Sequence, residues 1–145
     1  MSDRNFEFLK WDADEYGLGV PEMDHEHQGL VALINELARL ARDRAEREEL
    51  RTAMTKFIIY AKMHFRDEEN LMKKILFPFY QEHRAAHELL MRSLNEFFNI
   101  VDTGAGILPR SFFIFLRNWL LDHINSEDRL YAEYHRRQSK VASPL

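Results

Sequence analysis

Residues 76–80 read LFPFY, and this short stretch divides the most regular part of the chain. The residue before a proline disfavours the helical conformation, whereas proline itself suits the first turn of a helix. Pro78 therefore predicts that one helix ends near Phe77 and that another begins directly afterwards. The segments on either side, residues 50–75 and 80–101, carry apolar side chains at helical spacing, so we expect an antiparallel helix pair.

Two further helical segments flank this pair. Residues 24–42 repeat leucine and isoleucine at helical spacing after a Gly- and Pro-containing loop at residues 16–21. The joint to the next helix is placed near Asp43–Ala45. The last helix, residues 110–138, follows the breaker segment DTGAGILP at residues 102–109. Four helices with short joints predict an all-α fold, an up-down-up-down four-helix bundle.

Both ends of the chain are expected to belong to the same unit. Residues 1–20 form an N-terminal arm, and residues 139–145 form a frayed tail. A length of 145 residues suits one hydrophobic core, so residues 1–145 are interpreted as a single domain. The arm carries four apolar residues that should pack on the bundle: Phe6, Phe8, Leu9 and Trp11.

The composition excludes several classes of function. A net charge of −4 with dispersed Lys and Arg gives no reason to expect nucleic acid or a membrane surface as partner. The chain has no cysteine, which excludes disulfides, thiolate catalysis, iron–sulfur clusters and Cys-based zinc sites. No apolar run resembles a signal peptide or a membrane span, so a cytoplasmic location is expected. Seven histidines are the unusual feature.

Most of these histidines are predicted to lie at one depth of the bundle. Antiparallel helices bring residues level when they are equally far from the joining turn, and the third turn is taken near Gly106. Two pairs also share a helix face at i,i+4 spacing. The residues that meet by this reasoning are His27, His64, Glu68, His83, His87 and His123.

A single such histidine is more often a surface or core residue than a ligand, but this convergence favours a metal site. Nitrogen-rich ligation suits iron, zinc or copper better than calcium or magnesium. Five histidines with two or more carboxylates exceed the needs of one tetrahedral zinc, and two bridged ions would use them fully. His25 and His135 do not fit the layer and are expected to be exposed.

Four stretches carry a family pattern: MDHEHQGLVALINEL (23–37), HFRDEENLM (64–72), HRAAHELL (83–90) and WLLDHINSED (119–128). In order and spacing they resemble the hemerythrins, specifically the single-domain bacterial kind. The resemblance implies a non-haem di-iron site, with an oxo or hydroxo bridge, that binds O2 reversibly. The ligands it implies are His83, His87 and His123 on one iron, His27 and His64 on the other, and Glu68 and Asp128 between them.

Simple helix geometry conflicts with one of these residues. At 100° per residue, Glu127 lies about 40° from His123, whereas Asp128 lies about 140° away. Spacing alone would choose Glu127. A π-type turn would bring Asp128 onto the metal face, and such turns are common at functional sites. We therefore follow the resemblance and predict Asp128, and we expect Glu69 to point away from the metals into solvent.

Counting ligands on the implied site leaves one open position, on the iron held by two histidines. The side chains expected around it are apolar: Leu30, Trp119, Leu120 and Ile124. Such a dry pocket suits O2, or a small anion such as azide, and offers no acid, base or cation for an organic substrate. Tyr131 could hydrogen-bond a bridging carboxylate or could simply pack.

Three functional interpretations follow. The leading one is reversible O2 binding for carriage, storage, delivery or sensing, without enzyme activity and with an O2-consuming or redox protein as a possible partner. The alternative is a di-iron enzyme that acts on peroxide, O2 or nitric oxide. The third is a structural bundle that holds zinc or no metal, which metal analysis would identify.

Overall fold

The computed structural model describes residues 7–103 and 108–141, and within them every regular element is a helix. A continuous last helix is divided into two α-helical parts by a π-helical turn labelled η1. The elements are α1 (Ala13–Tyr16), α2 (Pro21–Arg42), α3 (Arg47–Lys74), α4 (Tyr80–Asp102), α5 (Arg110–Asp122), η1 (His123–Asp128) and α6 (Arg129–Val141).

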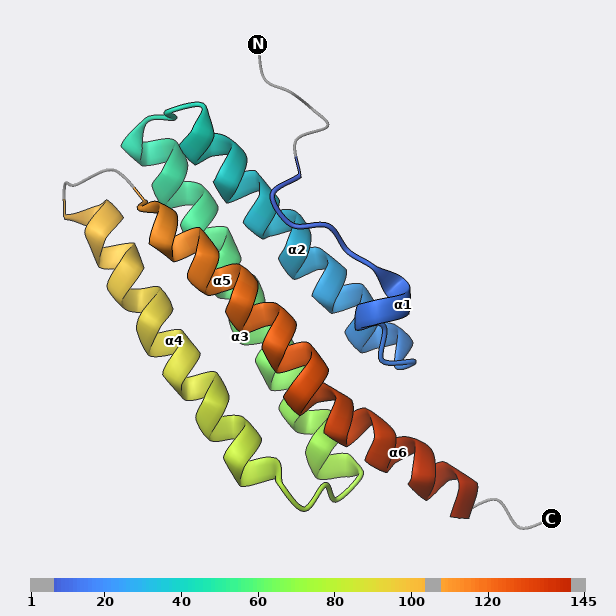
Figure 1. Ribbon diagram of the computed structural model, residues 1–145. Coiled ribbons are helices and arrows are strands. Elements are labelled where there is room, and N and C mark those ends of the chain that lie inside the picture. The colour runs from blue at the N-terminus through green and yellow to red at the C-terminus, as the bar shows by residue number, and fades with distance from the viewer. Residues whose placement is uncertain (1–6, 104–107, 142–145) are drawn as a thin grey trace.

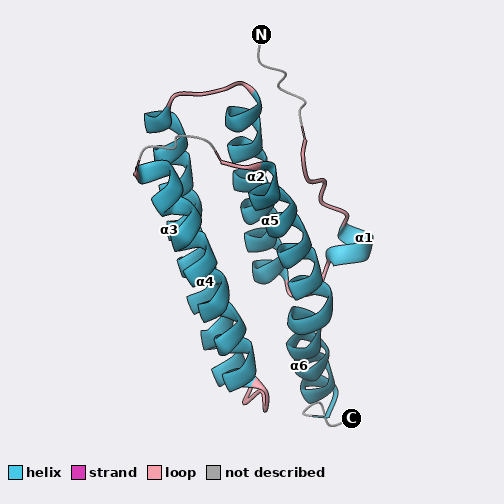
Figure 2. Cartoon of the chain, turned by 60° about the vertical axis from the view of Figure 1, so that its left-hand side comes forward, coloured by secondary structure: helices cyan, strands magenta, loops and turns pink. Residues whose placement is uncertain are grey.

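The long helices form the predicted antiparallel bundle. Figure 1 shows α2, α3, α4 and the α5–η1–α6 helix running alternately up and down, and Figure 2 shows the same helices turned by 60° about the vertical axis. The all-α, up-down-up-down expectation is confirmed. α6 extends beyond the bundle and reaches Val141, three residues into the segment expected to be a tail.

Two of the three predicted turns lie where the sequence places them. α3 ends at Lys74 and α4 begins at Tyr80, on either side of Pro78. Leu76 closes α3 in the left-handed conformation with φ of 56°, and the next backbone N–H donates back to the Met72 carbonyl over 2.9 Å. The joint expected near Asp43–Ala45 separates α2 from α3, whereas the turn expected near Gly106 lies outside the described residues.

The apolar stripes of the four helices make one core. Its most deeply buried members come from every helix, and their burial supplies the main favourable term for folding. Leu37, Met54, Leu94 and Leu116 are each 0% exposed. Among the described residues, none of the helices combines the length and apolar character that crossing a bilayer requires.

The N-terminal arm packs on the bundle as expected. Leu9 exchanges two backbone–side-chain hydrogen bonds of 2.8 Å with Asn35 on α2. Phe8 meets Phe113 edge-on with ring centroids 5.8 Å apart, and the Trp11 ring lies 6.3 Å from a histidine ring of α2. The arm also contains α1, which the sequence reading does not anticipate. Phe6 lies outside the described residues.

Candidate metal centre

Seven buried side chains from all four helices meet at one depth of the bundle. They form two groups of potential metal donors, and within each group the donor atoms lie within 4.8 Å of one another. Both groups contain Glu68 from α3 and Asp128 from η1. The first group adds His83, His87 and His123, and the second adds His27 and His64.

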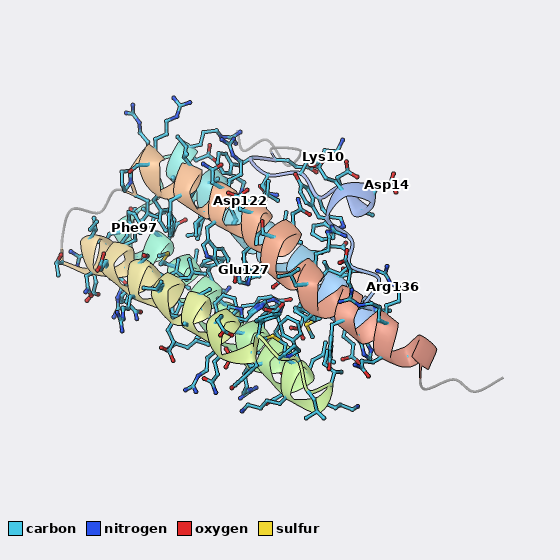
Figure 3. All side chains as sticks on the ribbon, turned by 60° about the horizontal axis from the view of Figure 1, so that its bottom comes forward. Lys10, Asp14, Phe97, Asp122, Glu127 and Arg136 are labelled. Atoms are coloured by element: carbon cyan, nitrogen blue, oxygen red, sulfur yellow. The ribbon has the colours of Figure 1, made fainter. Side chains whose placement is uncertain are left out.

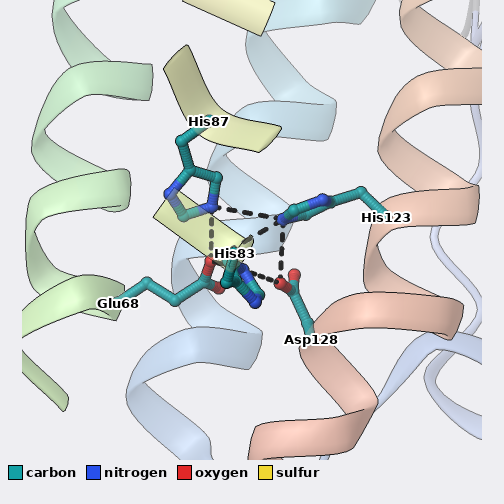
Figure 4. Close-up of side chains that lie close together, drawn as sticks. All are labelled: Glu68, His83, His87, His123 and Asp128. Carbon is teal, nitrogen blue, oxygen red and sulfur yellow. Dashed lines mark hydrogen bonds and ion pairs between the residues drawn. The ribbon is translucent and has the colours of Figure 1, made fainter. Parts of the chain in front are cut away.

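The first group surrounds a common centre, which Figure 4 shows. Glu68 Oε1 lies 2.9 Å from Nε2 of both His83 and His87. Asp128 Oδ1 lies 3.0 Å from Nε2 of both His83 and His123. The Nε2 atoms of His87 and His123 are 3.2 Å apart. Three imidazole nitrogens and two carboxylate oxygens therefore converge there.

The other oxygen of each carboxylate faces the second group. Glu68 Oε2 lies 3.4 Å from Nε2 of His64 and 3.7 Å from Nε2 of His27. Asp128 Oδ2 lies 3.0 Å from Nε2 of His27. Each carboxylate thus directs one oxygen to each group, which is the arrangement of a ligand that bridges two metal ions.

The donor atoms are chemically suited to a cation. Among the described residues, four buried atoms have no hydrogen-bond partner: Nδ1 and Nε2 of His27 and both carboxylate oxygens of Asp128. An unsatisfied buried polar atom costs about 1–3 kcal/mol, and more when it is charged. A bound cation would take three of these atoms as donors. Because the set is rich in imidazole nitrogen, it fits iron better than calcium or magnesium.

Asp128 reaches the site because the last helix widens locally. His123–Asp128 form the π-helical turn η1, so Asp128 shares a face with His123, which a regular α-helix would not allow. Glu127, labelled in Figure 3, keeps 43% of its side chain exposed, and its Oε2 lies 3.7 Å from Nδ1 of His123. The predicted π-type turn is present, and Glu127 belongs to neither donor group.

The carboxylates also set the protonation of the histidines around them. Burial lowers the pKa of His64, but the Glu68 charge and the hydrogen bonds to Glu26 and Glu68 outweigh it and raise this pKa to about 10. Burial likewise lowers the pKa of His123, and the neighbouring carboxylates, Asp128 first, raise it to about 10. Protons on the histidines therefore balance the carboxylates in the protein alone, and a metal cation would displace those protons.

Tyr131 supports the bridging carboxylate from behind. Its side chain is 0% exposed, and its hydroxyl donates a hydrogen bond of 2.8 Å to Glu68 Oε2. Burial, together with the nearby Glu68 and Asp128 charges, raises the pKa of Tyr131, so the hydroxyl keeps its proton and remains a donor. Of the two alternatives for Tyr131, the hydrogen bond to the carboxylate is therefore present.

Two acids orient histidines from outside the donor groups. Nδ1 of His64 lies 2.7 Å from Glu26 Oε1, and Nδ1 of His87 lies 2.8 Å from Glu69 Oε2. An imidazole whose Nδ1–H donates to a carboxylate is held with Nε2 facing the metal. The expectation that Glu69 is simply solvated is wrong, because its carboxylate turns toward His87 on the adjacent helix.

Neither of these supporting roles is visible in the sequence spacing. Glu26 adjoins His27, and Glu69 adjoins Glu68, so each acid stands beside a donor in the chain. Each nevertheless serves a histidine of the neighbouring helix. An acid directly beside a predicted ligand is the signal that could have found them.

Aromatic rings cover two of the histidines. Phe65 stacks on His87 with centroids 4.0 Å apart and an interplanar angle of 12°. Trp119 stacks on His123 at 4.8 Å and 15°, and the two covering rings lie 5.8 Å apart. The rings restrict the rotation of both imidazoles and exclude water from one side of the site.

The remaining predicted residues are placed as follows. Leu30, Leu120 and Ile124 are buried at 2%, 2% and 0% exposure, whereas Trp119 is half-buried. Of the histidines expected to be exposed, His25 is exposed and His135 is half-buried, and neither belongs to a donor group.

The fold and the two donor groups together define a four-helix bundle with a binuclear cation site in its core. Residues 18–134 match the family described as Hemerythrin HHE cation binding domain. The chain belongs to the hemerythrin family. Hemerythrin domains bind two non-haem iron ions, and the buried cluster of histidines and carboxylates suits such a pair.

Individual relatives resemble the chain over most of its length. The bacteriohemerythrin of Methylococcus capsulatus is 28% identical over 124 residues, which cover 86% of this chain and 94% of that protein. The bacteriohemerythrin of Stenotrophomonas maltophilia is 26% identical over 125 residues, covering 86% and 80%. A crystal structure of wild-type hemerythrin superposes with a TM-score of 0.81 at 28% identity, covering 87% of this chain and 96% of that one.

Proposed function

We propose that this protein binds O2 reversibly at two iron ions held by the two donor groups. The observation that carries the proposal is the position of Glu68 and Asp128, whose two oxygens each face a different group of histidines. When bound, a pair of ferrous ions supplies the two electrons that O2 needs to bind. Relatives named bacteriohemerythrin and the matching hemerythrin crystal structure support the assignment.

The two groups are unequal, and this inequality selects the place where O2 binds. Besides the shared carboxylates, the first group has three histidines, whereas the second has only His27 and His64. The second iron therefore has one fewer protein donor, and an exogenous ligand would bind on its side. The Nε2 atoms of His27 and His64 would hold that iron, and Glu26 would keep His64 oriented toward it.

Binding without turnover is the expected behaviour. We propose that Leu30, Leu120 and Ile124 line the ligand position, with Trp119 at its edge. These side chains offer no proton donor near the bound ligand apart from the indole N–H, and they exclude water. A pocket of this kind holds a small apolar molecule and provides no means to position an organic substrate.

The N-terminal arm is part of the functional unit in this proposal. Trp11 lies beside His27, with ring centroids 6.3 Å apart, and Arg129 donates a hydrogen bond of 2.9 Å to the Glu15 carbonyl of α1. We therefore propose that residues 1–145 form one domain. Deleting residues 1–12 should leave the bundle folded but weaken iron retention in the second group.

The decisive experiment is spectroscopic. The iron-loaded protein is reduced without air, exposed to O2 and then deoxygenated under argon while its absorption spectrum is recorded. We expect a coloured oxygenated form that appears and disappears over repeated cycles, and azide should bind the oxidised protein. Steady consumption of peroxide or nitric oxide, without a stable oxygenated form, would instead identify the enzyme alternative.

Ligand substitution tests the site itself. His64→Ala removes one of the only two histidines of the second group, so iron content should fall from about two ions per chain to about one, and O2 binding should be lost. His25→Ala, at an exposed histidine two residues before His27 and outside both donor groups, is the matched control and should change neither. Two bound irons and normal O2 binding in His64→Ala would contradict the assignment.

A further inference from the structure

A groove on the outside of the bundle leads to the first donor group. It runs between α3 and α4, which Figures 1 and 2 show side by side, and it encloses about 510 Å³. Phe65, His87 and Met91 lie along it. His87 both lines the groove and is a donor of the first group. A single side chain therefore separates solvent in the groove from the proposed iron.

The groove is basic although the protein is acidic. Five cationic side chains line it and only two acidic ones, Glu69 and Glu88, whereas the whole chain has a net charge of −4. All five cations are exposed. The cations are Lys62, Arg66 and Lys73 on α3, and Arg84 and Arg92 on α4.

Most of this positive charge is not neutralised locally. Arg84 lies 3.4 Å from Glu88, and Lys73 lies 5.3 Å from the centre of the Tyr80 ring. For the other three cations, the described part of the chain provides no ion pair within 4 Å. Glu69 is turned inward, with Oε2 2.8 Å from Nδ1 of His87. The outer rim of the groove therefore presents a net positive field to solvent.

We propose that this groove is the docking surface for a small acidic electron-transfer protein. The inference rests on the proposed function, because O2 binds only to the ferrous pair and a ferric pair must be reduced again. In each encounter the reduced partner gives one electron to one ferric ion and leaves oxidised, so two encounters restore two ferrous ions. The electron would pass through His87, which lines the groove and belongs to the donor group.

The extent of the charge favours a protein surface over a small anion. On α3, Lys62 and Lys73 are eleven positions apart, or about 16 Å at 1.5 Å per residue. A phosphate or sulfate ion could meet only one or two of these cations at once. An acidic face of a protein matches a row of this length. At 0.1 M salt, charges more than about 10 Å apart are largely screened, so an approaching partner responds to the charge of the groove more than to the net charge of the distant parts of the chain.

The first test uses an acidic plant-type ferredoxin as the probe, in its oxidised form for binding and in its reduced form for electron transfer. Titration of the ferric protein, followed by NMR at low salt, should shift signals of α3 and α4 on both sides of the groove. Stopped-flow reduction by the ferredoxin should slow as ionic strength rises. The double variant Lys62→Glu/Arg66→Glu should weaken binding and slow reduction by about tenfold or more.

A matched control carries the same change of net charge elsewhere. Arg136→Glu/Arg137→Glu alters two exposed arginines of α6, outside the groove, and should bind and accept electrons as the parent does within about twofold. The proposal would be overturned if both double variants lost ferredoxin binding and reduction rate to the same extent, or if the parent did not bind the ferredoxin. Saturable binding of inorganic phosphate that displaces the ferredoxin would also overturn it, because the groove would then be a small-anion site.

The same proteins separate this inference from the proposed function. After chemical reduction with dithionite, both double variants should form the oxygenated species as the parent does, because neither alters a donor. If the parent fails to bind O2 yet docks the ferredoxin in the groove, the proposed function fails and the docking surface remains. If O2 binding is normal but docking is absent, only the docking surface fails.

Discussion

Replacing Asp128 with asparagine tests how much the site depends on a bridging carboxylate. The substitution keeps the shape of the side chain but removes its charge and one of its two oxygens. Asp128 is 0% exposed, and its oxygens lie 3.0 Å from Nε2 of three histidines. Burial and the Glu68 charge raise its pKa, but His123 and His27 outweigh them and hold the pKa well below its ordinary value, so the surroundings favour the charged form.

The expected decrease in the free energy of unfolding follows from the loss of one charged partner in a buried cluster. Removing one member of a buried ion pair costs about 3–5 kcal/mol, because the other members remain buried without compensation. Urea denaturation of iron-free Asp128→Asn should show a decrease of this size in the free energy of unfolding. Iron content should fall from about two ions per chain to one or fewer, since the amide leaves only one oxygen where both groups shared a carboxylate.

Glu127→Gln is the matched control, since it removes a charge one residue away. Glu127 is 43% exposed, and its one contact with the site is the 3.7 Å approach of Oε2 to Nδ1 of His123 on the side away from the donor atom Nε2. The free energy of unfolding of this variant should therefore stay within about 0.5 kcal/mol of the parent, and two irons should remain. Unchanged stability and iron content in Asp128→Asn would refute the reasoning. The reverse pattern would assign the bridge to Glu127 instead.

Four further predictions concern the surroundings of the site. Tyr131→Phe removes the hydrogen bond to the bridging glutamate, and competition with a chelator should show iron affinity about 10- to 100-fold weaker. Leu120→Ala should lower the unfolding free energy by about 2–5 kcal/mol and speed autoxidation of the oxygenated form, with iron content unchanged. Trp11 lies against His27 of the second donor group, and Trp119 lies against His123 of the first. Stepwise iron loading should therefore quench the fluorescence of the two tryptophans in separate phases. Identical quenching curves in Trp11→Phe and Trp119→Phe would contradict this. Iron binding should release protons at pH 7, because three of the site histidines have pKa values raised to about 9–10; affinity should therefore rise with pH, which calorimetry in buffers of different ionisation enthalpy would measure.

The sequence by itself determined the architecture and the depth of the site. Apolar periodicity and the break at Pro78 were sufficient for the helices, because helix formation and chain reversal depend on nearby residues. Distance from each turn was sufficient to bring ligands on different helices level, because the rise per residue is constant. Spacing alone favoured Glu127; the π-type turn was predicted because the family resemblance implied Asp128, and η1 occupies His123–Asp128.

Only the tertiary structure decided which side chains meet across helices. The carboxylate of Glu69 turns to His87 on α4, and that of Glu26 turns to His64 on α3, although each acid adjoins a donor of its own helix. The basic groove likewise exists because α3 and α4 bring cations from two separate segments to one surface. Such contacts depend on how each helix is rotated and tilted against its neighbour. Packing of the whole core sets that rotation, so the spacing of residues within one helix does not predict it.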